Sequence, residues 1–378
     1  MNSHISIIKS IATCLTLEFQ PGRKKELQAL FSSPDFPWDY WIKTASDQYV
    51  LPAVYLQLER AGLLSVFPAD WLEHLSHLVE KNSERNHRIL EEVKIISSHL
   101  LQKGIEAVFL KGTAHLLLGL YTNPAERMIG DIDFLVKEED IFPAVDVLLD
   151  LGFHTLIEYK EEIHSEQKHY PRLVNYDYEA SVEVHRSVVL SPYNKAFSSS
   201  RILMNKQEVA GMPGVFVPSN QHLIVHNMMN AQFNDKAYSK RMILLRQMYD
   251  LLNLSKLEDP YKALLDFGSY KKQANAMLAV GSELFNLPDQ ISFNHSRGVR
   301  RYLKSLHWFQ NHPRILRFYL VLGFFVHRIW RYISFPVQAI FDRRSREGLR
   351  ARLIDLQWYK NHVNHYVYFF RPEKRFKK

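Results

Sequence analysis

The sequence predicts an α+β fold, in which a small mixed β-sheet lies between N- and C-terminal helical regions. Near both ends of the chain, apolar residues recur three or four positions apart over long stretches, as they do on one face of a helix. Between these stretches lie short apolar runs of the length of a strand. Of the 378 residues, 46% are hydrophobic and 23% are charged. This balance is typical of globular domains rather than disordered chains, and the length allows two or three of them.

The first 102 residues are predicted to form an N-terminal helical region. Its clearest periodicity runs from Trp71 to Val79 and resumes from Ile89 to Leu101, with apolar residues at spacings of three and four. Such amphipathic helices pack their apolar face against a core. We therefore expect this region to support a site rather than to contain one.

The pattern changes at Gly104, and residues 103–217 are predicted to form the sheet-containing core. The mostly apolar residues 105–110 predict a buried strand, and Lys111-Gly112-Thr113 is predicted to be a turn before a short helix over 114–121. A longer helix is predicted over 138–151, ended by Gly152. Further strands are expected at residues 131–136, 153–159, 172–178 and 181–189.

After the core the chain is predicted to be helical again. Residues 218–296, which begin at Pro218-Ser219, are expected to complete a cleft with the core, with helix extending to about Phe285. Residues 297–378 form a basic, aromatic-rich tail. Within the tail, the apolar run from Phe318 to Phe341 is expected to form a buried or interfacial helix broken at Pro336, because its uncharged part is too short to span a bilayer.

Cysteine content and the first residues bear on the compartment. Cys14 is the one cysteine, so neither an intrachain disulfide nor a cysteine-rich metal site can form. Residues 1–20 have mixed polarity and no small-residue cleavage site, unlike a secretory signal. We expect a cytoplasmic protein. Peripheral association with the inner face of the membrane remains open.

The charge is distributed unevenly along the chain. Residues 297–378 carry 19 Lys/Arg and 4 Asp/Glu, a balance of +15, whereas the rest carries 48 − 19 = 29 basic and 40 − 4 = 36 acidic residues, a balance of −7. This asymmetry favours a polyanionic partner for the tail. Contact with RNA, contact with an anionic membrane surface, and a helical packing domain with a solvated basic face all remain open.

The residues with most chemical content are Asp131 and Asp133. They are one residue apart on a predicted strand, so both carboxylates project from the same face. Adjacent carboxylates repel unless a cation lies between them, and Mg²⁺ prefers such oxygen ligands and often bridges to substrate phosphates. Alone, this pair would equally suit a solvated strand edge.

Features on both sides strengthen this interpretation. Upstream, Gly112 lets backbone N–H groups approach a phosphate, and Lys111 and Thr113 add a charge and a hydroxyl. Downstream, Glu183 lies between apolar residues on a predicted strand and is a candidate third carboxylate. Arg127 is a candidate for the nucleotide phosphates or for pairing with a site aspartate.

These motifs resemble a known family. The run from Phe109 to Ala114, then Tyr121, Pro124, Arg127 and the segment 130–136, is similar to the uncharacterised bacterial nucleotidyltransferase family, the fifth of the NTP-transferase families, within the polymerase-β-like superfamily. The segment 182–185 matches a later strand of that family, and His226, Leu245, Arg246 and Asp250 resemble its C-terminal helical pattern.

The resemblance implies a magnesium-dependent transfer of a nucleoside monophosphate from an NTP such as ATP to an acceptor, with release of pyrophosphate. Mn²⁺ is an alternative ion. The implied metal ligands and catalytic residues are Asp131, Asp133 and Glu183, and Lys111, Gly112, Thr113 and Arg127 are implied to bind the nucleotide.

Three further residues, His185, Arg246 and Asp250, are candidates for supporting contacts behind the site. A plain structural role for His185, and a simple ion pair between Arg246 and Asp250, remain open. Two other functions also remain open for the chain as a whole: a toxin-like nucleotidyltransferase acting on RNA, and a non-catalytic nucleotide-binding protein of the same fold.

Overall fold

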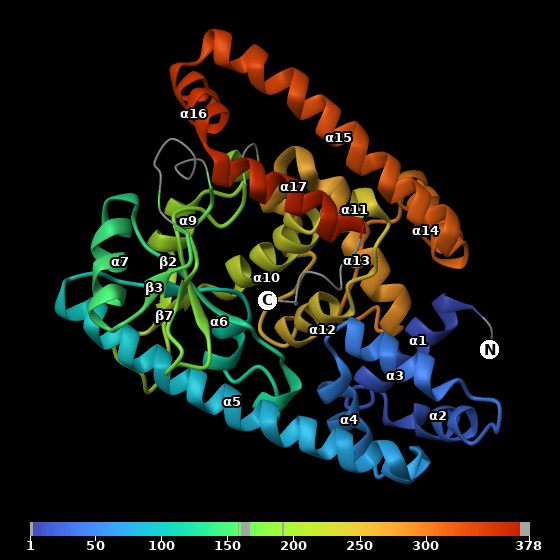
Figure 1. The fold of residues 1–378 in the computed structure, drawn as a ribbon. Helices are drawn as coiled ribbons and strands as arrows, with labels where there is room; N and C mark the ends of the chain where they lie inside the picture. The colour runs from blue at the N-terminus through green and yellow to red at the C-terminus, as the bar shows by residue number, and fades with distance from the viewer. Residues whose placement is uncertain (1–2, 158, 160–166, 191–192, 371–378) are drawn as a thin grey trace. The chain divides into compact units, whose positions relative to one another are not determined.

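The computed structural model of the chain describes residues 3–157, 159, 167–190 and 193–370 (Figure 1). It divides into two compact units, one formed by residues 1–157 and 168–313 and the other by residues 158–167 and 314–378. The larger unit contains a mixed β-sheet with helices before and after it in the chain. The α+β class predicted from the sequence is confirmed.

Residues 3–102 are mainly helical. Ser3 caps α1 by accepting a hydrogen bond from the backbone N–H of Ser6. The fully buried Trp41 donates from Nε1 to Ser10 Oγ at 2.9 Å and so satisfies its own polar group. The helical elements of this region are α1 (His4–Leu15), η1 (Pro21–Arg23), α2 (Lys24–Phe31), α3 (Trp38–Asp47), α4 (Leu51–Arg60), η2 (Leu64–Val66) and the long α5 (Ala69–Gln102).

The sheet has seven strands in the order β3-β4-β5-β2-β1-β7-β6. Its centre is mixed, because β2 runs parallel to β5 and antiparallel to β1, and β1 runs parallel to β7. The strands are β1 (Val108–Phe109), β2 (Asp131–Leu135), β3 (His154–Thr155), β4 (Leu173–Val174), β5 (Ser181–His185), β6 (Lys206–Glu208) and β7 (Phe216–Pro218).

The predicted strands lie where the sequence placed them, but several are shorter, and β6 and β7 were not predicted. Residue 158, within the predicted strand 153–159, lies outside the described residues. The segment 111–113, predicted as a turn, already forms the first turn of a helix. The core helices are α6 (Lys111–Leu117), η3 (Pro124–Glu126), η4 (Glu138–Asp140), α7 (Ile141–Asp150), η5 (Tyr193–Lys195) and α9 (Ser199–Met204).

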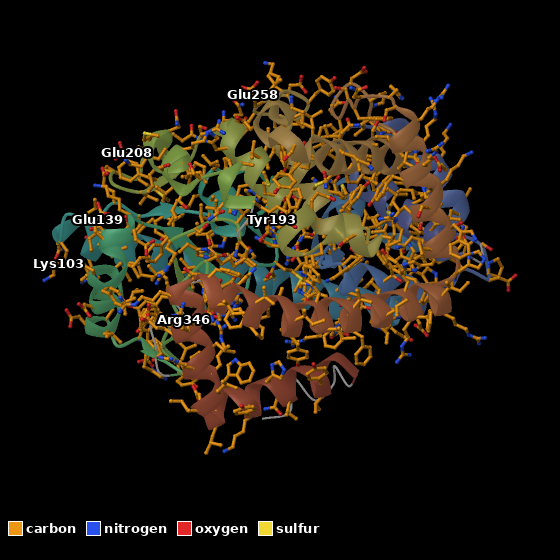
Figure 2. The ribbon with its side chains drawn as sticks, turned by 90° about the horizontal axis from the view of Figure 1, so that it is seen from above. Lys103, Glu139, Tyr193, Glu208, Glu258 and Arg346 are labelled. Atoms are coloured by element: carbon orange, nitrogen blue, oxygen red, sulfur yellow. The ribbon has the colours of Figure 1, made fainter. Side chains whose placement is uncertain are left out.

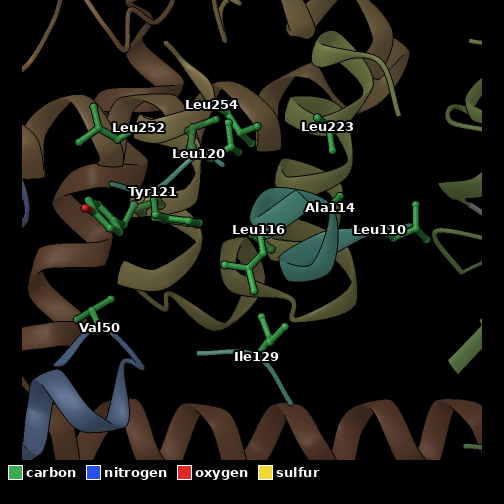
Figure 3. Packing of buried hydrophobic residues seen from close by; sticks show 14 of the residues in the cluster. Val50, Leu110, Ala114, Leu116, Leu120, Tyr121, Ile129, Leu223, Leu252 and Leu254 are labelled. Atoms are coloured by element: carbon green, nitrogen blue, oxygen red, sulfur yellow. The ribbon is translucent and has the colours of Figure 1, made fainter. Parts of the chain in front are cut away.

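Among the helices after the sheet, α10 packs against α6. Ala114 and Leu116 of α6 belong to the same buried cluster as Leu223, Leu252 and Leu254 (Figure 3). The long α5 also packs against α6 and α7. The helical elements of this region are α10 (Asn220–Met229), the π-helical η6 (Asn230–Asn234), α11 (Ala237–Lys240), α12 (Leu245–Leu254), η7 (Lys262–Tyr270), α13 (Lys271–Phe285) and α14 (Arg297–Asn311).

The smaller unit consists mainly of α15 (Pro313–Phe341), α16 (Arg343–Ile354) and α17 (Leu356–Phe370). The prediction that Pro336 breaks the helix was wrong, because α15 continues through it to Phe341. The turn before the proline is anchored by the Tyr332 hydroxyl, 2.5 Å from His362 Nε2 of α17. Within the described residues, no helix is long and apolar enough to cross a membrane.

A buried ion pair joins α12 to the core. Asp250 is 1% exposed and accepts from Arg127 Nη2 at 3.0 Å and from the Tyr121 hydroxyl. Burial alone would raise the pKa of Asp250, but the charge of Arg127 together with other neighbours, among them the Tyr121 hydroxyl, outweighs it and lowers the pKa. One residue earlier in each segment, Glu126 accepts from Tyr249 Oη at 2.6 Å and pairs with Arg60 at 3.0 Å. These contacts fix α12 against the loop that precedes β2.

Replacing one member of the buried pair is expected to be costly. Asp250→Asn leaves the Arg127 guanidinium buried without its counter-charge, and we expect the free energy of unfolding to fall by about 3–5 kcal/mol. The matched control is Asp47→Asn, which removes an exposed pair with Lys43 and should cost no more than about 0.5 kcal/mol. Urea unfolding measures both, and equal losses in the two variants would contradict a structural role for the buried pair.

Gly112 is required by packing. A Cβ atom at this position would lie 2.3 Å from Ile129 Cγ2 and 3.5 Å from the Arg127 guanidinium. The backbone of α6 therefore lies directly against the segment that leads into β2, at a distance only glycine allows.

This close approach predicts a specific coupling. Gly112→Ala should reduce the free energy of unfolding by about 1–3 kcal/mol through overpacking, and Ile129→Ala should reduce it through a cavity. In the double variant the new methyl group occupies space vacated by Ile129, so the combined loss should be smaller than the sum. Additive losses in thermal unfolding would show that the two residues do not compete for this space.

Candidate active site

The site is built on the register of two neighbouring parallel strands. β2 and β5 pair in register, with Asp131 opposite Ser181, Asp133 opposite Glu183 and Leu135 opposite His185. Residues two apart on a strand point to the same face, and so do residues directly opposite each other. The sheet therefore gathers Asp131, Asp133, Glu183 and His185 on one face.

Three of these side chains form a compact buried group. Carboxylate oxygens of Asp133 and Glu183 and a ring nitrogen of His185 all lie within 4.8 Å of one another. His185 Nε2 is 2.7 Å from Asp133 Oδ1 and 3.5 Å from Glu183 Oε2, and Nδ1 of the same ring lies 3.2 Å from the Ser187 carbonyl oxygen. The backbone carbonyl thus orients the imidazole with Nε2 toward the carboxylates.

Lys111 supplies a positive charge to this group from the end of β1. Its Nζ donates to Asp133 Oδ1 at 2.6 Å and lies 4.0 Å from Glu183 Oε2. The residue has φ +50°, in the left-handed region, which costs a non-glycine residue about 1–2 kcal/mol. This backbone bend turns the chain from β1 into α6, at the residue whose ammonium group meets the carboxylates.

Arg172, just before β4, links the remaining aspartate to the group. One guanidinium nitrogen donates to Asp131 Oδ2 at 3.1 Å and to Glu183 Oε1 at 2.8 Å. Half of the Arg172 side chain is exposed, against 31% for Asp131 and 8% for Glu183. Asp131 and Arg172 therefore form the solvent-facing side of the cluster, and Asp133 and His185 form its buried side.

The pKa shifts follow from burial and from these charges. Burial would raise the pKa of Asp133, but Lys111 and His185 outweigh it and hold the pKa well below its usual value. Burial would also raise the pKa of Glu183, but neighbouring groups, first among them the hydrogen bond with His185, lower this pKa to about 2. Asp131 differs, because burial and then the charge of Asp133 raise its pKa. Asp133 and Glu183 are thus held as anions, and their negative charges make ionisation of the neighbouring Asp131 less favourable.

The donor set fits a divalent cation. Two buried carboxylates supply the hard oxygen ligands that Mg²⁺ and Mn²⁺ take, and Nε2 of His185 adds a nitrogen ligand, which suits Mn²⁺ better than Mg²⁺. The ligand set predicted from the sequence contained Asp131 and lacked His185. In the structure the compact group contains His185, and Asp131 is joined to it through Arg172.

The residues predicted to bind the nucleotide lie in different surroundings. Lys111 is in the cluster. Thr113 is 1% exposed, with its hydroxyl donating to the Asp131 carbonyl oxygen at 3.4 Å, and Gly112 packs on Ile129. Arg127 pairs with Asp250. Phosphate binding by these residues remains a prediction.

Asp250 and Arg246, which were predicted to lie behind the site, each have a contact outside the cluster. Asp250 takes Arg127 as its ion-pair partner, and the Arg246 guanidinium lies 5.0 Å from the centre of the Tyr49 ring. The charge of Arg246 also contributes to lowering the pKa of Asp250, so the interaction that the four-residue spacing suggested exists beside these contacts.

Sequence reasoning did not place several basic residues beside the cluster. Arg172, His169 and Lys168 all precede β4; His169 Nε2 lies 3.6 Å from Glu183 Oε2. Burial and the charge of Lys111 lower the pKa of Lys168. The antiparallel bridge between His169 and His185 brings this segment beside β5. The one available signal in the sequence was that these basic residues lie shortly before the strand β5, which carries Glu183.

The mixed sheet thus presents three carboxylates together with lysine and arginine side chains on one face. The comparison with protein families indicates which family has this sequence. A family described as uncharacterised nucleotidyltransferase matches residues 34–280. The match covers more than half of the chain, so the chain belongs to that family. No curated protein matches the chain.

Metal binding tests the donor set directly. Asp133→Asn and Glu183→Gln should each weaken binding of Mn²⁺ by at least about tenfold, and His185→Ala by about 10–100-fold if the imidazole is a ligand. The control Glu139→Gln alters an exposed acid next to β2 (Figure 2) and should bind Mn²⁺ as the wild type does. Electron paramagnetic resonance measures free Mn²⁺, and unchanged affinity in all three site variants would exclude this cluster as the metal site.

Proposed function

We propose that the protein transfers a nucleoside monophosphate from an NTP to an acceptor, with a divalent ion held by Asp133 and Glu183. One observation carries this proposal: the in-register pairing of β2 with β5 places the two buried carboxylates side by side. Asp131 on the exposed side and His185 on the buried side complete the set of residues able to contact the ion.

The balanced reaction needs few groups from the protein. An acceptor oxygen forms a bond to the α-phosphorus of the NTP, the bond from that phosphorus to the bridging oxygen of the β-phosphate breaks, and pyrophosphate leaves with those electrons. The acceptor proton passes to a carboxylate or to solvent. A divalent ion at this site neutralises charge on the phosphate oxygens and orients the reacting groups.

Positively charged side chains of the protein would bind and neutralise the rest of the triphosphate. Phosphoryl-type transfer is accelerated mainly by positioning and by stabilising charge. Lys111 lies at the carboxylates, and the half-exposed Arg172 reaches from Asp131 to Glu183. We assign these two side chains to the triphosphate, Lys111 as a compact point charge and Arg172 as a fork able to bind two oxygens.

The acceptor and the nucleotide are left open by this geometry, and one experiment addresses both. The full chain is incubated with each α-labelled NTP, Mg²⁺ or Mn²⁺, and the protein, RNA and small-molecule fractions of a cell extract. Label in RNA would support the toxin-like function, and label in protein or in a small molecule would identify another acceptor class. Binding of an NTP without transfer to any fraction would instead support a non-catalytic nucleotide-binding protein.

Substitutions at the cluster connect any such activity to the site. Asp133→Asn should reduce the transfer rate by at least about 100-fold, the order expected for losing one preorganised electrostatic group. Arg172→Gln should reduce it less and mainly by raising KM for the NTP. Glu139→Gln serves as the control and should retain the wild-type rate. Transfer that survives Asp133→Asn unchanged would contradict the proposed site.

A further inference from the structure

The outer face of α15 is a long apolar surface in the smaller unit. At 100° per residue, ten of its exposed apolar side chains fall within an arc of about 140°, and the stretch they cover is about 40 Å long; the exposed Phe325 and Tyr332 lie just beyond one edge of this arc. Each of the ten is between 42% and 84% exposed. The members of this outer face, as we define it, are Ile315, Phe318, Leu322, Val326, Ile329, Trp330, Ile333, Val337, Ile340 and Phe341.

The opposite face of α15 is occupied by contacts within the same unit. The Phe324 ring lies 5.4 Å from the Tyr366 ring of α17, with the Arg328 guanidinium 5.2 Å from the centre of that same ring. Nearer the C-terminal end of α15, the Arg352 guanidinium of α16 lies 4.5 Å from the centre of the Phe335 ring. The hairpin of α15 with α16 and α17 thus uses the face that carries the arginines and leaves the outer face exposed.

No acidic or basic residue of α15 falls within the arc of the outer face, and basic side chains lie near both ends of the helix. Arg314 and Arg317 are exposed at its start, and Arg343, Arg346 and Arg350 are exposed just beyond its end. Residues 314–370 carry 10 Lys/Arg and 3 Asp/Glu, a balance of +7. An apolar helix face with cationic residues around it is the pattern of a helix that lies in a membrane interface.

We propose that the smaller unit docks on an anionic lipid surface through the outer face of α15. The apolar side chains enter the boundary between headgroups and acyl chains, and the exposed arginines near both ends of α15 attract the anionic headgroups. The helix lies parallel to the membrane, because its apolar arc runs along its length from Ile315 to Phe341.

Two other occupants fit these observations less well. RNA binding relies on cations that contact phosphates, and the outer face has none across its arc. A second copy of the same face would bring two segments of charge +7, residues 314–370 of each chain, together without compensating charge. An anionic lipid surface satisfies both the apolar face and the charge around it.

The test uses the full chain and two kinds of vesicle, one of phosphatidylcholine and one of phosphatidylcholine with phosphatidylglycerol. We expect the protein to float with the anionic vesicles and not with the neutral ones. The triple variant Leu322→Gln, Ile329→Gln, Ile333→Gln should bind at least about tenfold more weakly. Arg314→Gln, Arg317→Gln, Arg350→Gln should also bind more weakly and lose most of the dependence on salt.

The matched control places glutamine at three exposed apolar positions of the larger unit, Leu149, Met204 and Leu265, and should bind as the wild type does. Circular dichroism shows whether each variant keeps its helices, as expected for substitutions on exposed faces. The proposal is overturned if the apolar triple variant binds anionic vesicles normally, or if the wild type binds neither kind of vesicle.

Two further outcomes would also overturn it. One is wild-type binding to RNA but not to vesicles, with loss of that binding in the arginine variant. The other is self-association of the chain in sedimentation that only the apolar triple variant abolishes. Because vesicle flotation requires no nucleotide, its result is independent of whether the proposed transfer activity exists.

Discussion

The in-register parallel pairing of β2 with β5 is the constraint on which the site depends. It brings Asp133 and Glu183 together where both are more than nine-tenths buried. Two unit charges within 4.8 Å repel by roughly 3–4 kcal/mol at an effective dielectric constant of about 20. The fold therefore needs positive charge at this place, and Lys111 and Arg172 provide it. A divalent ion bound to the same oxygens would meet this need more fully.

The buried polar network around Asp250 has a structural role. Arg127, Asp250, Tyr121 and Glu126 are buried and satisfy one another or nearby groups. They hold α12 against the loop that leads into β2, and so help to fix the position of the strand that carries Asp131 and Asp133. A single sequence cannot separate these structural charges from the charges of the cluster, because both sets lie within the same short segment.

The sequence predicted the parts of the fold that follow from periodicity. The helical N-terminal region, the strand at Asp131 and the strand carrying Glu183 are present where the pattern placed them. The strand β6 was missed because Lys206–Glu208 contains no apolar residue, and β7 because it ends at Pro218, which was predicted to begin a helix. Pro336 was predicted to end its helix, but the turns on both sides of it are held, by Tyr332 against His362 of α17 and by Arg346 of α16 donating to the Ala339 carbonyl oxygen.

The site was predictable only in outline. That Glu183 lies on a strand next to β2 was inferred from its apolar neighbours, and the structure has this arrangement. The inclusion of His185 in the compact group depends on register, and the contacts of Arg172 depend on how the chain before β4 folds back, neither of which a single sequence reveals. The choice of Asp250 as the partner of Arg127 spans 123 residues and likewise has no local signal.

The central claim is that Asp133 and Glu183 hold a divalent ion for chemistry on a nucleotide. The most direct measurement is a crystal structure of the full chain with Mn²⁺ and a non-hydrolysable NTP, with anomalous diffraction used to locate the ion. The account predicts a manganese peak within bonding distance of both carboxylates and of a phosphate oxygen. A triphosphate bound away from this cluster, with Lys111 still bonded to Asp133 and no manganese between the carboxylates, would contradict it.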